Sequence, residues 1–145
     1  MPQVSIRTQV AKPLPETWEA FMDESLLKQW MQGFESIELV EGRKGEVGSV
    51  YEMKMREGKR IMTCLETVTD IQPEKLYAFH MDGAGMRTEV KVHFAASPEG
   101  TVIDSEVESQ GTNLFYKIVL RLFGSMMRKR MIADMQRFRR LVEAQ

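Results

Sequence analysis

The chain has 145 residues, of which 43% are hydrophobic and 28% are charged, and its formal net charge is −1. This composition is close to that of an average soluble domain, so it excludes a disordered chain and gives no sign of a membrane-spanning segment. The length is sufficient for one domain, residues 1–145, to bury a core without disulfides or metals. Cys64 is the only cysteine, and the N-terminus lacks the pattern of a signal peptide, so we expect a cytoplasmic protein.

The first third of the chain predicts a strand and two short helices. Residues 4–10, VSIRTQV, alternate apolar and polar side chains, which is typical of a strand with one face in water. The next segment changes to helical spacing. Pro15 suits the first position of one helix, Asp23 can cap a second, and Gly33 suits the end of the second.

Residues 35–110 predict a series of antiparallel hairpins, because almost every apolar run there is strand-like and is bounded by turn residues. Residues that face each other across a hairpin share one face of the sheet, so the turn lengths predict the register. The predicted pairs include Phe79 with Thr88, Val90 with Val107, Glu66 with Met81, and Met53 with Met62.

Residues 113–142 predict one long helix that covers the apolar face of the sheet. About 30 residues at about 1.5 Å each reach about 45 Å. Apolar side chains recur at three- and four-residue steps, with a second stripe in the first half, so we expect the start of the helix to be more deeply buried than its end. Gly124 and Ser125 predict a bend.

This order of elements resembles the START-related helix-grip superfamily (SRPBCC), which includes polyketide cyclases, lipid-transfer proteins and pollen-allergen-like proteins. VAKPLPETWEAFMD is similar to the family's strand-to-helix segment, LLKQWM to its second short helix, and VTDIQPEKLYAF to its strand–turn–strand. The resemblance extends over essentially the whole chain. It implies an α+β fold in which a curved antiparallel sheet wraps around the long C-terminal helix and leaves an apolar cavity for a small hydrophobic ligand.

Methionine is abundant, with twelve in the chain, and several are predicted to converge between sheet and helix. Flexible, polarizable methionines would let such a pocket accept varied apolar ligands, although they could equally fill a solid core. The residues predicted to contact the ligand are Tyr51, Met53, Met62, Glu66, Tyr77, Phe79, Met81, Thr88, Val90, Val107, Phe123, Met127 and Met131.

Glu66 would place a carboxylate on this apolar wall if the register holds. Burial would then raise its pKa and prepare it as a general base or a ligand anchor. A bulge that turns Glu66 outward, or an ion pair with Arg60, is the simpler interpretation, and we prefer it. His80 and His93 are predicted on the outer face, but a turn one residue longer would bring His80 into the cavity as an acid or base.

Other chemistry has little support. Cys64 has no partner at the spacing of a metal or redox site, and neither glycine-containing turn leads from a strand into a helix as a phosphate loop does, so we expect no metal and no cofactor.

The C-terminal segment is basic. Residues 113–145 contain eight Lys or Arg against two Asp or Glu, whereas the rest contains twelve against nineteen. The arginines lie mostly away from the apolar stripe, so we interpret them as a solvated helix face. We expect no nucleic-acid binding, because the body is acidic, and no membrane contact, because packing already explains the stripe. The arginines concerned are Arg128, Arg130, Arg137, Arg139 and Arg140.

The leading hypothesis is a domain that binds or carries a small hydrophobic molecule, as a monomer or homodimer, without a dedicated catalytic apparatus. The second is a metal-free enzyme of the cyclase, aromatase or dehydratase type, in which Glu66, Tyr51 or His80 moves protons and the cavity orients the substrate. The third is a protein-binding module, resembling the heat-shock ATPase activator branch of the superfamily.

Overall fold

The structure is a computed structural model that describes residues 4–83, 85–111 and 114–145; the side chains of residues 111, 114–117 and 119–124 lie outside the description. Its elements are, in chain order, β1 (Val4–Val10), α1 (Leu14–Met22), the 3-10 helix η1 (Glu24–Leu26), α2 (Leu27–Trp30), β2 (Phe34–Glu41), β3 (Val50–Glu57), β4 (Arg60–Gln72), β5 (Leu76–Gly83), β6 (Met86–Ser97), β7 (Gly100–Gly111) and α3 (Leu114–Glu143).

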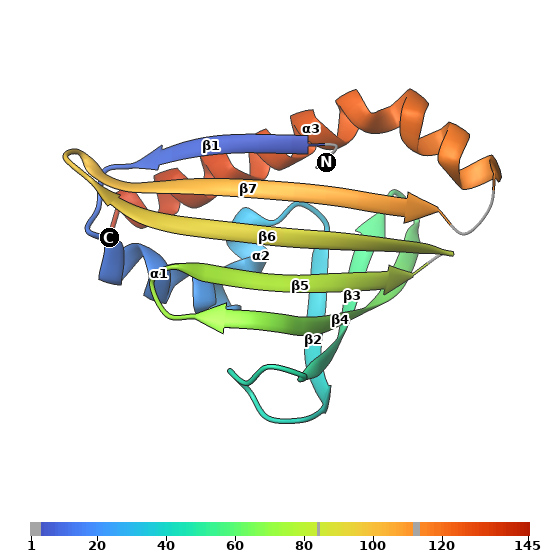
Figure 1. Ribbon diagram of the computed structural model, residues 1–145, viewed down its shortest axis with the longest axis horizontal. Coiled ribbons are helices and arrows are strands. Elements are labelled where there is room, and N and C mark those ends of the chain that lie inside the picture. The colour runs from blue at the N-terminus through green and yellow to red at the C-terminus, as the bar shows by residue number, and fades with distance from the viewer. Residues whose placement is uncertain (1–3, 84, 112–113) are drawn as a thin grey trace.

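The strands form a seven-stranded antiparallel sheet with the order β1-β7-β6-β5-β4-β3-β2. Figure 1 shows α3 running alongside β1 and β7, and α1 and α2 lie on the same face of the sheet as α3. The predicted α+β helix-grip architecture is therefore confirmed, with two short helices after the first strand and a long C-terminal helix packed on the sheet.

The local signals at the N-terminus act as predicted. Burial in β1 alternates residue by residue, and Pro15 lies in the first turn of α1. The Asp23 carboxylate caps η1 by accepting a hydrogen bond of 3.0 Å from the backbone N–H of Ser25. After α2, Gly33 takes a φ of +80°, and a Cβ there would lie 2.6 Å from the carbonyl oxygen of Arg56, so the close approach to β3 requires glycine.

Two of the predicted registers are confirmed. Val90 pairs with Val107 between β6 and β7, and Glu66 pairs with Met81 between β4 and β5. A β-bulge between Val68 and Asp70 was not predicted, but it follows Glu66 along β4 and leaves that residue on the inner face.

The β5–β6 register was predicted wrongly by two residues. Phe79 pairs with Val90 rather than with Thr88, because β5 continues through Asp82 and Gly83, the first two residues of the expected loop. The end of this hairpin is held by an ion pair of 2.8 Å between Arg87 and Asp82, and the sequence pattern had placed Asp82 in the loop.

The β3–β4 register was wrong by the same amount. Met53 pairs with Cys64 rather than with Met62, because Gly58, at a φ of +63°, begins the tight turn one position later than expected. Each of the two register errors amounts to two residues, so every side chain lies on its predicted face of the sheet although its cross-strand partner differs.

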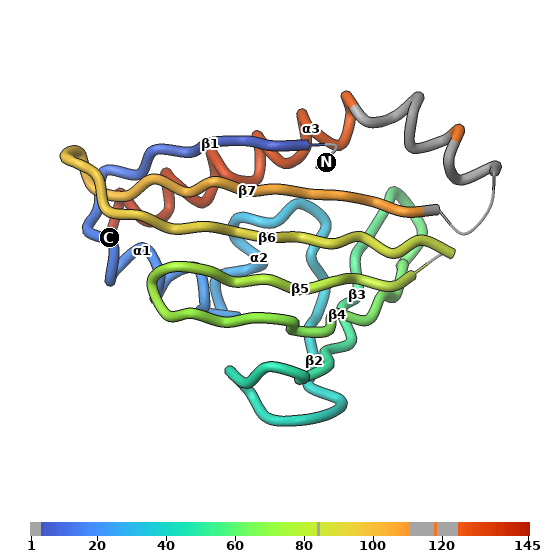
Figure 2. The backbone as a smooth tube through the Cα atoms, in the orientation of Figure 1, coloured from blue at the N-terminus to red at the C-terminus, as the bar shows by residue number. Residues whose placement is uncertain are grey.

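The core lies between β1, β6 and β7 on one side and α1, α2 and the C-terminal half of α3 on the other. Figure 2 shows this half of the helix passing close to β1 and β7. Phe138 is fully buried, with ring centroids 5.7 Å from Phe21 and 5.2 Å from Trp30. Met135 and Val142 continue the predicted stripe and are also buried.

The start of α3 lies mostly outside the described side chains, so its predicted deeper burial is not tested there. Of its described residues, Ile118 and Met126 are exposed. The bend at Gly124 and Ser125 stays a prediction. Among the residues that the structure describes, no helix has both the length and the apolar character needed to cross a bilayer.

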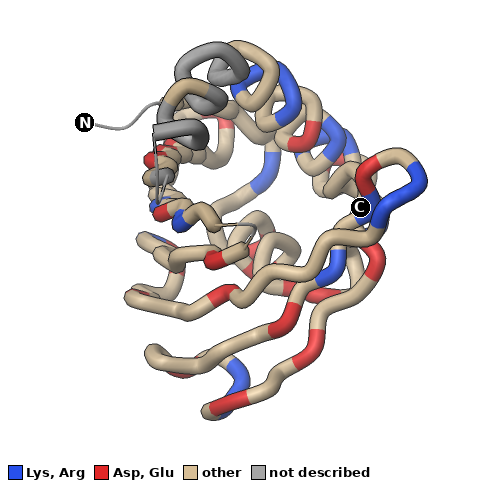
Figure 3. Tube along the Cα trace, turned by 90° about the vertical axis from the view of Figure 1, so that its right-hand side faces the viewer, with Lys and Arg blue, Asp and Glu red and all other residues tan. Residues whose placement is uncertain are grey.

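The arginines of α3 are bound to the body more than we predicted. Figure 3 shows basic residues gathered along the helix and acidic residues spread over the strands. Arg130 donates to the Glu57 carboxylate and, at 3.0 Å, to the carbonyl oxygen of Gln32, and Arg137 donates at 3.1 Å to that of Trp30. Because both side chains are half-buried and bonded, their assignment to a solvated face was wrong.

The packing predicts that Phe138→Ala lowers the free energy of unfolding by about 3–5 kcal/mol, because the lost ring leaves a cavity among aromatic neighbours. Met126→Ala is the control on the same helix: its side chain is 62% exposed, so we expect a change within about 0.5 kcal/mol. Urea unfolding of both variants measures the difference. Equal losses would contradict this account of the core.

Candidate ligand cavity

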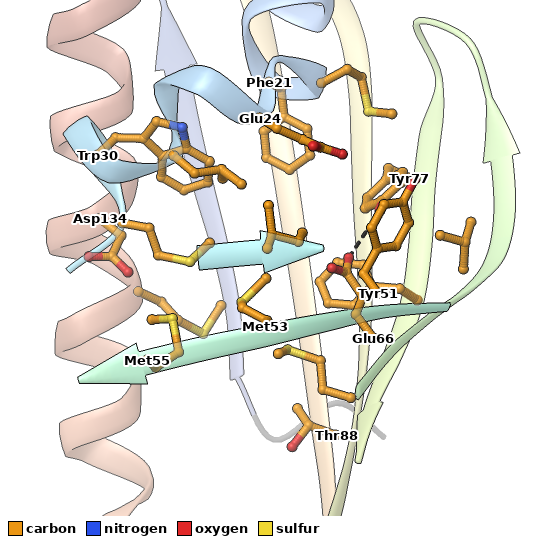
Figure 4. Close-up of a pocket in the computed structure, with 18 of the residues that line it drawn as sticks. Phe21, Glu24, Trp30, Tyr51, Met53, Met55, Glu66, Tyr77, Thr88 and Asp134 are labelled. Carbon is orange, nitrogen blue, oxygen red and sulfur yellow. Dashed lines mark hydrogen bonds between the residues drawn. The ribbon is translucent and has the colours of Figure 1, made fainter. Parts of the chain in front are cut away.

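A cavity of about 680 Å³ lies between the inner face of β3, β4 and β5, the α1–α2 segment and the middle of α3. Its volume is in the usual range for sites that bind small organic molecules. Figure 4 shows side chains from the strands and from both helical segments pointing into this space. The lining is mainly apolar, and its aromatic and aliphatic members are Phe21, Met22, Leu27, Trp30, Met31, Ile37, Tyr51, Met53, Met55, Val68, Ile71, Tyr77, Phe79, Met81, Met127 and Met131.

Most of the sequence-predicted contact residues lie in this lining. Those that do are Tyr51, Met53, Glu66, Tyr77, Phe79, Met81, Thr88, Met127 and Met131. They come from four strands and from α3, which is the arrangement that the shared sheet face predicted.

Three of the predicted residues lie elsewhere. Met62 lies nearer the β3–β4 turn than predicted, opposite Met55, and its side chain is 43% exposed. Val90 and Val107 pack in the solid core, since β6 and β7 lie under the well-packed half of α3 rather than over the hollow. The side chain of Phe123 lies outside the described residues.

The sequence reasoning missed the wall contributed by the short helices. Phe21 and Trp30 stack with centroids 5.8 Å apart, and both line the cavity together with Met31. The sequence did carry a signal, because Phe21 and Met22 share one apolar face of the predicted helix. Hairpin register carries no information about how a helical segment folds over a sheet.

Glu66 is the main polar feature of the cavity. Its side chain lies on the inner face of β4 and the residue is only 4% exposed. The Tyr77 hydroxyl donates a hydrogen bond of 3.0 Å to Glu66 Oε1, drawn in Figure 4. The preferred interpretation from sequence was wrong: no bulge turns Glu66 outward, and Arg60 is an exposed residue at the far end of the strand.

The surroundings of Glu66 shift its ionisation toward neutral pH. Burial raises its pKa to about 7, the Tyr77 hydrogen bond opposes this rise, and the negative charge of Glu24 adds to it. Burial and the nearby Glu66 also raise the pKa of Tyr77, so its phenol stays protonated and remains a donor. Tyr51 pairs with Glu66 across the strands, and burial raises its pKa as well.

The other charged side chains of the described lining lie beside groups of opposite charge. Lys44 lies 4.0 Å from the Glu24 carboxylate, and Arg130 is bound to Glu57. Asp134 accepts a hydrogen bond from the backbone N–H of Gln32 and pairs with Arg137. In the described part of the chain, Glu66 has Tyr77 as its hydrogen-bond partner and no cation within ion-pair distance.

His80 does not reach the cavity. Its Nδ1 lies 3.0 Å from the Asp82 carboxylate on the outer face of the sheet, as the register predicted. His93 is also outside, with Nε2 3.6 Å from Glu106. Cys64 is half-buried, and burial raises the pKa of its thiol. No three His, Cys, Asp or Glu side chains of the described residues are placed to hold a metal ion.

A family model described as polyketide cyclase / dehydrase and lipid transport matches residues 1–143. Solved structures with the same fold include TTHA0849 from Thermus thermophilus, with 19% identity, a TM-score of 0.77 and coverage of 97% of each chain. Another is BH1534 from Bacillus halodurans, with 21% identity, a TM-score of 0.72 and coverage of 99% of this chain and 98% of the other.

The chain is also similar to Ara h 8.0201, with 16% identity, a TM-score of 0.72 and coverage of 98% of this chain and 97% of that one. At these identities the structures show a shared fold and nothing finer. A search of curated proteins found no match.

The raised pKa of Glu66 predicts a pH-dependent stability. Its folded value of about 7 exceeds the ordinary 4.5, so the native state holds this proton more tightly than the unfolded chain does. The stabilisation is complete below about pH 4.5 and disappears as the pH rises through about 7. Glu66→Gln, which stays neutral, should therefore gain up to about 3 kcal/mol relative to the wild type between pH 5 and pH 8.

Urea unfolding at several pH values measures this difference. Glu52→Gln is the matched control, since Glu52 lies on the neighbouring strand, outside the cavity lining, and carries the same charge. A wild-type profile that stays parallel to that of Glu66→Gln would show that Glu66 is not perturbed by burial.

Proposed function

Because this chain belongs to the polyketide cyclase / dehydrase and lipid transport family, we propose that it binds or carries a small hydrophobic molecule, lipid or polyketide-like, in the cavity beneath α3. Members of this family typically bind hydrophobic ligands, so the proposal adds the place and the residues.

The observation that carries the proposal is the hollow itself. Protein interiors are normally close-packed, with few voids larger than a water molecule, and a cavity of about 680 Å³ departs strongly from that rule. Its walls are mainly apolar, so an apolar molecule that enters releases ordered water and gains dispersion contacts.

The proposed ligand contacts divide into two sets. Methionines from the sheet and from α3, such as Met53, Met81 and Met131, supply an adaptable apolar surface. Glu66 and Tyr77 supply the polar groups that fix the orientation of the ligand, since both lie in the lining and are already hydrogen-bonded to each other.

Partial filling of the cavity should weaken ligand binding. We expect Met81→Trp to weaken the binding of a fluorescent apolar probe at least about tenfold, because the larger side chain occupies the hollow. Met62→Trp makes the same chemical change on the same sheet outside the lining, so it should bind as the wild type does. Probe titration, supported by native mass spectrometry of the gently purified protein, measures both. A wild type that binds no apolar probe, or a Met81→Trp variant that binds normally, would contradict the proposal.

A second candidate function is an enzyme of the cyclase, aromatase or dehydratase type. The observation in its favour is the buried pair of Glu66 and Tyr77, because a carboxyl group with a pKa of about 7 is matched to proton transfer near neutral pH. Tyr51 is the other lining residue that could take part, whereas His80 lies on the outer face.

This candidate predicts that a polyketide-like substrate is turned over by the wild type, with a rate that rises or falls through about pH 7 as Glu66 titrates. Glu66→Gln should lower the rate at least about a hundredfold and leave apolar-probe binding within about twofold. Assays of turnover and of binding on the same preparations separate the two effects. If turnover persists in Glu66→Gln, another group transfers the proton.

A further inference from the structure

Glu66 has an environment that is unusual for a buried carboxylate. It lies on an apolar cavity wall, its hydrogen-bond partner among the described residues is a neutral phenol, and no described cation compensates its charge. An ionised carboxylate that is buried without a cation is expensive, so such a group is normally protonated or paired. The cavity therefore offers a position for a cation that the described residues do not supply.

The charged side chains around the cavity favour a cation over an anion. Among the described lining residues there are four carboxylates and two cations; Arg130 is bound to Glu57, and Lys44 lies 4.0 Å from Glu24. Glu24 lies near enough to influence the ionisation of Glu66. A ligand anion would therefore meet the uncompensated carboxylate of Glu66, and each described lining cation already lies beside a carboxylate.

The aromatic rings beside Glu66 also favour a positively charged ligand group. Tyr77 lies against Phe79 and Phe21, with ring centroids 5.3 Å and 6.1 Å apart, and Tyr51 pairs with Glu66 itself. The faces of such rings attract an organic cation, and the attraction grows when water is excluded. The Glu66 carboxylate and the rings of Phe21, Tyr51, Tyr77 and Phe79 all line the same apolar cavity.

We propose that the natural ligand is an amphipathic amine, whose protonated nitrogen is bound by Glu66 beside Tyr77 and whose apolar body fills the methionine-lined part of the cavity. This inference rests on the proposed function, because it presumes that an apolar molecule enters the cavity, and it adds the chemical class of that molecule. Tyr77 orients the carboxylate through Oε1, which leaves Oε2 to accept a hydrogen bond from the ammonium group.

Three probes with the same twelve-carbon body separate amine from other head groups: dodecylamine, dodecanol and dodecanoate, each in competition with a fluorescent apolar probe at pH 8 and low salt. Primary amines are protonated at this pH. We expect dodecylamine to bind at least about tenfold more tightly than dodecanol, and dodecanoate to bind most weakly. In Glu66→Gln the amine should lose at least about tenfold in affinity, while dodecanol changes by less than about twofold.

Glu52→Gln is the control for net charge and should keep the preference for the amine, because Glu52 lies outside the lining. A second test needs no variant: in the wild type, the amine-to-alcohol affinity ratio should rise from pH 5.5 to pH 8 as Glu66 ionises. The groups that face Glu66 are Tyr51, Tyr77, Cys64 and Glu24, and the first three stay protonated over this range because their pKa values are raised.

The outcomes distinguish the two proposals. If all three probes bind equally, or if dodecanoate binds most tightly, the amine inference is wrong and the apolar cavity remains. An amine preference that survives in Glu66→Gln also overturns it. If neither the fluorescent probe nor any of the three ligands binds, the proposed function itself fails.

Discussion

One helix cannot cover the inner face of seven strands, and the cavity follows from this limit. Strands lie about 4.8 Å apart, so seven of them span roughly 29 Å, whereas a helix with its side chains is only about 10–12 Å wide. In this chain α3 packs on β1 and β7, and the short helices close the space near β6. The inner faces of β3, β4 and β5 are left facing a hollow, and their apolar side chains become a cavity wall.

Because the helix packs on one side only, its position depends on bonds to the rest of the chain. Arg137 and Arg130 donate to the last carbonyl of α2 and to the carbonyl of Gln32, and Arg130 also reaches the β3–β4 turn through Glu57. These bonds tie α3 to the end of α2, to the segment that follows it and to the end of β3. Arg130 and Glu57 thus form an ion pair between the basic C-terminal segment and the acidic body, whose charges Figure 3 shows.

The sequence predicted which face of the sheet each side chain occupies better than it predicted which residue lies opposite on the next strand, and the reason is physical. Side chains alternate along a strand, so a slip of two residues changes every neighbour and no face. Tyr51, Phe79 and Glu66 were therefore placed on the inner face even where the turn had been misread. The prediction for Met62 was wrong, because a register error also misplaces a residue along the length of the strand pair. Met62 was expected on the cavity wall, and it lies at the exposed end of the sheet. The short-helix wall depends on tertiary packing of α1 and α2, which no turn length encodes.

Glu66 places an ionisable group on an otherwise apolar wall, and this is its most informative property. A glutamine of the same shape could accept the Tyr77 hydrogen bond without bringing a charge into the cavity, so the carboxylate is not needed to complete the wall. Above about pH 7 the ionised group destabilises the fold that contains it. A ligand cation in the cavity would offset that loss, because it binds the native state and neutralises the charge of Glu66. The same carboxylate would then contribute to ligand affinity and to the stability of the occupied protein.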